Sequence, residues 1–78
     1  MNSDTATQAA VLATAIEHGP INTGQVHRAA RTRTRLDARR LIGLMLDAGL
    51  LADGDVYGTY EVTADGRAML AGAGAMPA

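Results

Sequence analysis

Six of the seven basic side chains of this chain lie within thirteen consecutive residues, "RAARTRTRLDARR" at positions 28–40, and all of them are arginines. They are Arg28, Arg31, Arg33, Arg35, Arg39 and Arg40. A guanidinium group stays protonated at physiological pH, and its planar fork of N–H donors matches a phosphate or the major-groove edge of guanine. This density of arginine indicates that the segment binds a polyanion. The alternative interpretation is an ordinary charged face in contact with solvent.

The charge of the chain is unevenly distributed along its length. Residues 1–46 hold six arginines and three carboxylates, a net charge of +3, whereas residues 47–78 hold one arginine and five carboxylates, a net charge of −4. A local positive field can attract a polyanion even though the formal net charge of the whole chain is −1.

Residues suited to other chemistry are scarce. Cysteine is absent, the only serine is Ser3, and neither a glycine-rich phosphate loop nor a pair of catalytic acids is evident. His18 and His27 have no further ligands at metal-binding spacing, and the carboxylates between residues 53 and 65 do not have the spacing of a calcium loop. We therefore expect no enzymatic activity, no metal and no cofactor.

The length of 78 residues allows one domain with a single small core. That core must be built from Leu, Ile, Val and Met, because Tyr57 and Tyr60 are the only aromatic residues. No basic segment followed by an apolar one begins the chain, and no run approaches the ~20 apolar residues that span a bilayer. We expect a cytoplasmic protein with no membrane partner, a mobile N-terminus at residues 1–4, one domain at residues 5–70 and a Gly/Ala-rich tail at residues 71–78.

Apolar residues at helical spacing define the first part of the domain. They predict a helix over residues 5–17 whose buried face carries Ala9, Leu12, Ala13 and Ile16. The sequence "HGP" at residues 18–20 ends this helix, because Gly19 can adopt the left-handed cap and the proline cannot continue the helix. Ile21 then stands alone as an extended residue, and a cap at Asn22 or Thr23 begins a second helix that runs to about residue 30.

A third helix is predicted over residues 35–48. Thr34 can cap its start, with Asp37 at the capping-box position near the positive helix end, and Gly49 can close it. One face of this helix is apolar and carries Ala38, Leu41, Ile42, Met45 and Ala48. The opposite face carries Leu36, Arg39, Arg40, Gly43 and Asp47.

The remainder of the domain is predicted to be a hairpin and a short helix. The sequence "LLADGDVYGTYEVT" at residues 50–63 indicates two antiparallel strands, with a turn signal at Asp53-Gly54 and a second reversal signal at Gly58. Thr63 begins a final helix that ends near Leu70. The expected fold class is α+β and mostly helical, with a three-helix core, a two-stranded hairpin and a short C-terminal helix.

Two segments resemble parts of a winged helix-turn-helix domain, and with the order of elements the resemblance covers residues 5–70. "MLDAGLL" at residues 45–51 resembles the end of a recognition helix that runs into the wing, and "YEVTADGRAML" at residues 60–70 resembles the return strand and its Thr-x-x-Gly helix start. Both recur in small bacterial repressors related to the multiple-antibiotic-resistance, arsenical-resistance and phenolic-acid-decarboxylase regulator families. The resemblance implies that the second and third helices bind duplex DNA, with the start of the third in the major groove.

The resemblance also implies roles for the arginine segment. The base-reading candidates are Arg35, Leu36 and Arg39. The phosphate-contacting candidates are Arg28, Arg31, Thr32, Arg33, Thr34, Arg40 and Gly43. A glycine at position 43 allows close approach of the backbone to DNA, or close packing in a dimer. The chain departs from the family pattern twice: the wing carries Asp53 and Asp55 and no basic residue, and "RTRT" replaces the usual glycine between the two DNA-reading helices.

We therefore expect a transcriptional regulator of a bacterium, phage or plasmid, a repressor that occludes a promoter, is nucleoid-associated when bound to DNA and has no small-molecule effector. The alternatives are a phage or plasmid architectural or excision factor, and a winged-helix protein-interaction module that uses its acidic wing. A homodimer through the first and last helices is also expected, because small domains gain stability by association. The apolar residues left for that contact are Val11, Ala15, Leu44 and Leu46. Otherwise, they complete the core of the monomer.

Overall fold

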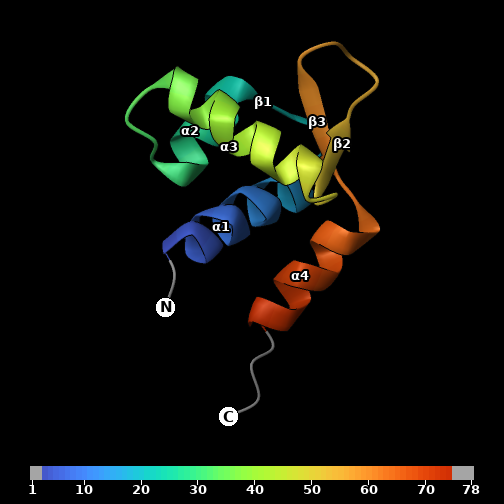
Figure 1. Ribbon diagram of the computed structural model, residues 1–78. Helices are drawn as coiled ribbons and strands as arrows, with labels where there is room; N and C mark the ends of the chain where they lie inside the picture. Colours follow the sequence, from blue (N-terminus) through green and yellow to red (C-terminus); the bar gives the residue numbers. More distant parts are fainter. Residues whose placement is uncertain (1–2, 75–78) are drawn as a thin grey trace.

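The computed structural model describes the backbone of residues 3–74 and the side chains of residues 6–72. Over this part of the chain, four helices and a three-stranded antiparallel sheet form an α+β structure that is mostly helical (Figure 1). In chain order the elements are α1 (Ser3–His18), β1 (Ile21–Asn22), α2 (Thr23–Ala30), α3 (Arg35–Asp47), β2 (Leu51–Asp53), β3 (Thr59–Val62) and α4 (Ala64–Gly74). The predicted order of elements is confirmed. No described helix combines the length and the apolar character needed to cross a membrane.

The end of α1 and the start of α2 follow the sequence signals. Gly19 has a φ of +82° and donates its N–H to the carbonyl oxygen of Ala15 at 2.9 Å, which closes α1. At the start of α2, the Asn22 side chain accepts the N–H of Gln25 at 2.9 Å, and the Gln25 side chain accepts the N–H of Asn22 at 2.9 Å. This reciprocal pair satisfies two amide donors that the first turn would otherwise leave free.

The predicted start of α3 is also confirmed. Thr34 is extended, and its hydroxyl oxygen accepts the N–H of Asp37 at 3.1 Å, so the helix begins at Arg35. The core face predicted for this helix is confirmed except at Ala48, which follows the helix and is exposed. The fully buried residues of α3 are Ala38, Ile42 and Met45.

The sheet has three strands in the order β1-β3-β2, one strand more than predicted. Ile21 is not isolated, because it pairs with Tyr60 of β3 and its side chain is fully buried. β2 and β3 form the predicted antiparallel hairpin. A strand of two residues is too short to show an alternating pattern, so the sequence could not reveal its pairing.

The hairpin reverses at Gly58 rather than at Asp53-Gly54. Gly54 still belongs to the paired region, since its N–H donates to the carbonyl oxygen of Thr59 at 2.8 Å. The chain turns at the far end of the loop, where Gly58 has a φ of +84° and the N–H of Thr59 donates to the carbonyl oxygen of Val56 at 3.1 Å. The loop therefore projects beyond the paired strands (Figure 1).

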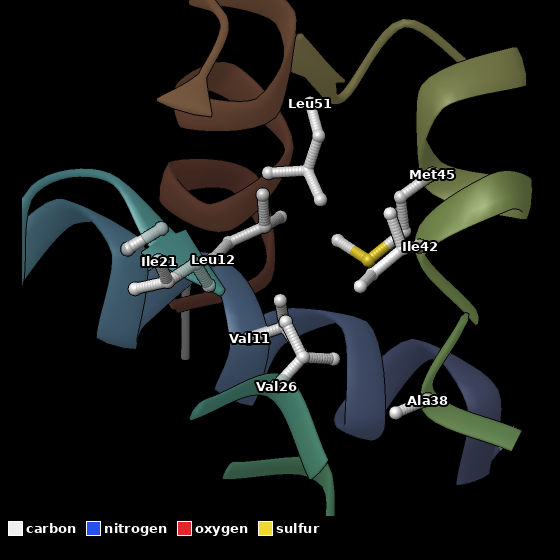
Figure 2. Close-up of a cluster of buried hydrophobic side chains, with 9 residues drawn as sticks. Val11, Leu12, Ile21, Val26, Ala38, Ile42, Met45 and Leu51 are labelled. Carbon is white, nitrogen blue, oxygen red and sulfur yellow. The ribbon is translucent and has the colours of Figure 1, made fainter. Parts of the chain in front are cut away.

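The core is a single apolar cluster to which α1, α2, α3 and the sheet all contribute (Figure 2). It consists of Val11, Leu12, Ala15, Ile21, Val26, Ala38, Ile42, Met45 and Leu51. The face predicted for α1 is partly wrong, because Val11 and Ala15 are buried whereas Ala13 and Ile16 are exposed. α1 is apolar on several sides, so the spacing of its residues does not determine which side packs inward. Val11 and Ala15 complete the core of the monomer and are not available to a dimer.

The end of α3 and the start of α4 share one junction. Gly49 has a φ of +77°, and its N–H and that of Leu50 fold back onto carbonyl groups in the last turn of α3. The Thr63 hydroxyl donates to the carbonyl oxygen of Gly49 at 2.5 Å and accepts the N–H of Gly66 at 3.0 Å. Gly66 is buried, and a Cβ there would overlap the carbonyl oxygen of Leu50 and lie 3.1 Å from Cδ2 of Leu12. These contacts explain the Thr-x-x-Gly pattern.

Both terminal helices are longer than predicted. α1 begins at Ser3 and therefore includes residues 3–4 of the segment expected to be mobile, and α4 continues to Gly74, four residues beyond Leu70. The rest of the two predicted terminal segments, residues 1–2 and 75–78, lies outside the described residues.

Candidate nucleic-acid interface

The arginine segment, residues 28–40, lies on the last turn of α2, the following turn and the first half of α3, and all six arginine side chains are exposed. Within the described residues, none of their guanidinium groups has an ion pair or a hydrogen bond. No carboxylate among the described side chains therefore accounts for the clustering. The like charges repel one another, so an external anion would relieve the positive potential that they create.

α3 presents its polar face to solvent. Leu36 is 57% exposed, and Arg39 and Arg40 are exposed on the side away from the core, as predicted. Gly43 lies further along this helix, and a Cβ there would meet nothing within 4 Å. No described internal contact therefore requires glycine at position 43.

Arg28 and Arg35 bring their guanidinium groups to one place from two different helices. A Cβ built on Gly24, in the first turn of α2, would lie 3.8 Å from Nη2 of Arg35 and 4.0 Å from Nη1 of Arg28. The absence of a side chain on Gly24 leaves room there, beside Oδ1 of Asn22, which would lie 3.3 Å from the same Cβ. One phosphate can accept from two guanidinium groups at once, so the geometry suits Arg35 to a phosphate shared with Arg28. The sequence alone did not single out Gly24.

Arg31 is the residue that caps the end of α2. It adopts the left-handed conformation at the end of α2, with a φ of 55° and a ψ of 42°. Glycine adopts this conformation without strain, whereas a residue with a Cβ pays about 1–2 kcal/mol. The turn between α2 and α3 therefore keeps a positive charge at a position where its backbone favours a glycine.

Hydrogen bonds around Thr32 hold the shape of this turn. The N–H of Thr32 donates to the carbonyl oxygen of His27 at 3.3 Å, and its hydroxyl donates to the carbonyl oxygen of Thr34 at 3.0 Å. The same hydroxyl also forms a hydrogen bond of 2.5 Å with Nδ1 of His27. Thr32 therefore shapes the turn, whereas the Thr34 hydroxyl proton has no acceptor among the described residues. The role of His27 was missed, because sequence spacing does not show which side chain it meets.

Arg31→Gly is expected to raise the free energy of unfolding by about 0.5–1 kcal/mol, because the relief of left-handed strain exceeds the backbone entropy that glycine loses. The same variant should bind a polyanion more weakly. Arg33→Gly is the matched control: it removes the same charge from the same turn, where φ is not positive, and should lower stability. Urea unfolding followed by circular dichroism measures both. Equal losses of stability in the two variants would contradict the strain at Arg31.

An open groove of about 680 Å³ lies between one side of α3 and the hairpin, and its lining includes the core residue Ile42. Its lining includes Arg39 and Gly43 from α3, and Asp53, Asp55 and Tyr57 from the hairpin side. Tyr57 is fully exposed. The acidic hairpin thus borders the exposed face of α3, although within the described residues neither carboxylate forms an ion pair with Arg39.

No protein-family model, curated protein or solved structure matches the chain. What the interface can bind therefore follows from its own charges, exposures and hydrogen bonds. The interface consists of exposed guanidinium groups along α2, the turn and α3, unpaired within the described residues, and the acidic hairpin borders it on one side.

Proposed function

We propose that the chain is a winged helix-turn-helix protein that binds duplex DNA sequence-specifically as a small transcriptional regulator, with α3 in the major groove. The observation that carries this proposal is the set of exposed, unpaired arginines on α2, the turn and the outer face of α3. Two helices joined by a short turn and followed by an antiparallel hairpin support it. Occlusion of a promoter is the simplest mechanism, so the regulator is expected to be a repressor.

Within this proposal, four exposed residues of α2 and α3 divide into two groups. Arg39 makes a bidentate contact to guanine, and Leu36 packs against a thymine methyl group. Arg28 and Arg35 hold one backbone phosphate at the open place beside Gly24. This assignment differs from the base contact predicted for Arg35 from its position in the sequence.

A homodimer belongs to the same proposal. A two-fold dimer would place two copies of α3 on a two-fold symmetric DNA site. Since Val11 and Ala15 are in the core, the contact must use other apolar residues. Exposed candidates are Ile16 on α1, at 37%, and Leu44 on α3, at 62%.

Fluorescence-anisotropy titration against random and genomic upstream duplexes, between about 50 and 200 mM salt, tests the proposal. The wild-type chain should bind with a steep salt dependence. Arg35→Ala should weaken binding to all sequences and reduce the salt slope by about one, the signature of a lost phosphate contact. Arg39→Ala should cost about 1–3 kcal/mol on the preferred sequence and much less on random DNA.

Arg67→Ala is the control for a general effect of charge. Arg67 is the seventh arginine, and it is exposed on α4, outside the arginine segment. Its removal changes the net charge by the same amount and should leave the affinity within about twofold. If the wild-type chain fails to bind DNA even at the lowest salt concentration, the proposal is wrong.

A protein-interaction module is the second candidate, and one observation favours it. The tip of the acidic hairpin exposes Tyr57 fully and Val56 at 67%. An exposed aromatic side chain is a frequent anchor of protein interfaces. In that case DNA binding would be absent, and Tyr57→Ala would abolish a protein complex that Arg39→Ala leaves intact. An architectural or excision factor would instead share the DNA binding and bend the duplex.

A further inference from the structure

The carboxylates of Asp53 and Glu61 lie on opposite faces of the hairpin. In the register of β2 and β3, Asp53 is paired with Tyr60, and Glu61 is paired with Ala52. Directly paired residues point to the same side of a sheet, and successive residues point to opposite sides. Asp53 therefore shares the side of Tyr60, with which it lines the groove beside α3, whereas Glu61 lies on the other side.

The groove brings two carboxylates next to the proposed base-reading residue. Asp53 and Asp55 line it together with Arg39 of α3. Both aspartates are exposed, and within the described residues neither has a cationic partner. Their negative charge is therefore not neutralised inside the molecule, and it acts on whatever lies against α3 from the side of the hairpin.

We propose that Asp53 and Asp55 form an electrostatic barrier that keeps the DNA backbone away from the hairpin and confines the duplex to the side of the α2–α3 turn. The inference rests on the proposed function, because it concerns the DNA that α3 would bind. A duplex held by Arg39 brings its phosphates close to the groove, where two uncompensated carboxylates repel them. Arg28, Arg31 and Arg33, on α2 and the turn before α3, attract the same backbone.

This barrier acts on every sequence, because it depends on phosphates and not on bases. It lowers the affinity for random DNA, which competes with the target site for a regulator in the cell. The hairpin is thus a positioning element that works by repulsion, and the contacts of the arginine segment set where the duplex lies.

The test compares two isosteric changes. Asp53→Asn/Asp55→Asn removes the groove carboxylates, and Glu61→Gln removes a carboxylate from the opposite side of the same hairpin. All three residues are exposed, so both variants should melt at the wild-type temperature. The double variant should bind a random duplex about three- to tenfold more tightly at 50 mM salt, with a salt slope steeper by up to about two. Glu61→Gln should change the affinity less than twofold.

The outcomes separate the inference from the proposed function. If the wild-type chain binds DNA but the double variant binds no more tightly than Glu61→Gln, the barrier is overturned and the DNA-binding proposal stands. A weaker affinity in the double variant also overturns it, since the aspartates would then contribute to binding. If the wild-type chain does not bind DNA at any salt concentration, the proposed function fails and the inference fails with it.

Discussion

Replacing Gly66 by alanine is expected to lower the free energy of unfolding by about 3 kcal/mol, at the upper end for overpacked sites. The new methyl group would overlap the carbonyl oxygen of Leu50 and press on the side chain of Leu12, which is fully buried. A backbone oxygen cannot rotate away as a side chain can. The start of α4 would therefore have to move, at the cost of the Thr63 hydrogen bond that caps it.

Gly72→Ala is the matched control in the same helix. Gly72 is exposed, and a Cβ there would meet nothing within 4 Å. Alanine has the higher helix propensity, so this change should leave stability unaltered or raise it by up to about 1 kcal/mol. Thermal and urea unfolding of both variants give the comparison. A Gly66→Ala variant as stable as wild type would mean that α4 does not pack closely against Leu50.

Met45→Ala is expected to cost about 2–5 kcal/mol, the range for truncating a large buried side chain. Met45 is fully buried on α3 and points into the apolar cluster that Ile42 and Leu51 also enter (Figure 2). Its loss would leave a cavity where α3 meets the rest of the core. Because the total free energy of unfolding of a small domain is itself only about 5–15 kcal/mol, the variant should lose a large part of its stability at 37 °C.

Leu44→Ala provides the comparison from the adjacent residue of the same helix. Leu44 is 62% exposed, so its truncation should change the stability of the monomer, measured at a protein concentration too low for a dimer to form, by about 0.5 kcal/mol or less. The contrast between the two variants tests the rotation of α3, which decides that Arg39 and Arg40 face solvent. Equal losses at positions 44 and 45, measured by urea unfolding, would show that the helix is rotated differently and that its arginines do not form one exposed face.

Much of the fold could be predicted from residues that have few conformational choices. Thr34 and Gly49 delimit α3 to within one residue, because a cap and a left-handed glycine each satisfy backbone groups that a helix end leaves free. Gly19 and the following proline did the same for the end of α1. Caps are local, so a short stretch of sequence is enough to place them.

The features that could not be predicted depend on contacts between distant segments. Ile21 becomes a strand only because Tyr60 lies beside it. α1 is apolar on several sides, and only its packing partners decide that Val11 and Ala15 face inward. The hairpin contains two turn signals, and the pairing of Gly54 with Thr59 moves the reversal to Gly58.

In the candidate site, too, local features could be predicted, whereas contacts between helices could not. Charge and helical spacing predicted which residues would be exposed on α3, and Leu36, Arg39 and Arg40 are exposed. The spacing could not show that the guanidinium groups of Arg35 and Arg28 both approach Gly24, since they come from different helices. Nor could it show the left-handed Arg31, because the identity of the residue argues against that conformation.

The hydroxyl of Thr63 has a consequence for how the molecule opens. It donates to the carbonyl oxygen of Gly49, just after α3, and accepts the N–H of Gly66 in the first turn of α4, and the N–H of Thr63 itself donates to the carbonyl oxygen of Leu50. Thr63 therefore ties the segment just after α3 to the first turn of α4, so the amide hydrogens of this junction should exchange as one cooperative unit. The segment after α3 is thereby tied to the start of α4, whereas the arginine-bearing first turn of α3 is held separately by the Thr34 cap and by the buried Ala38.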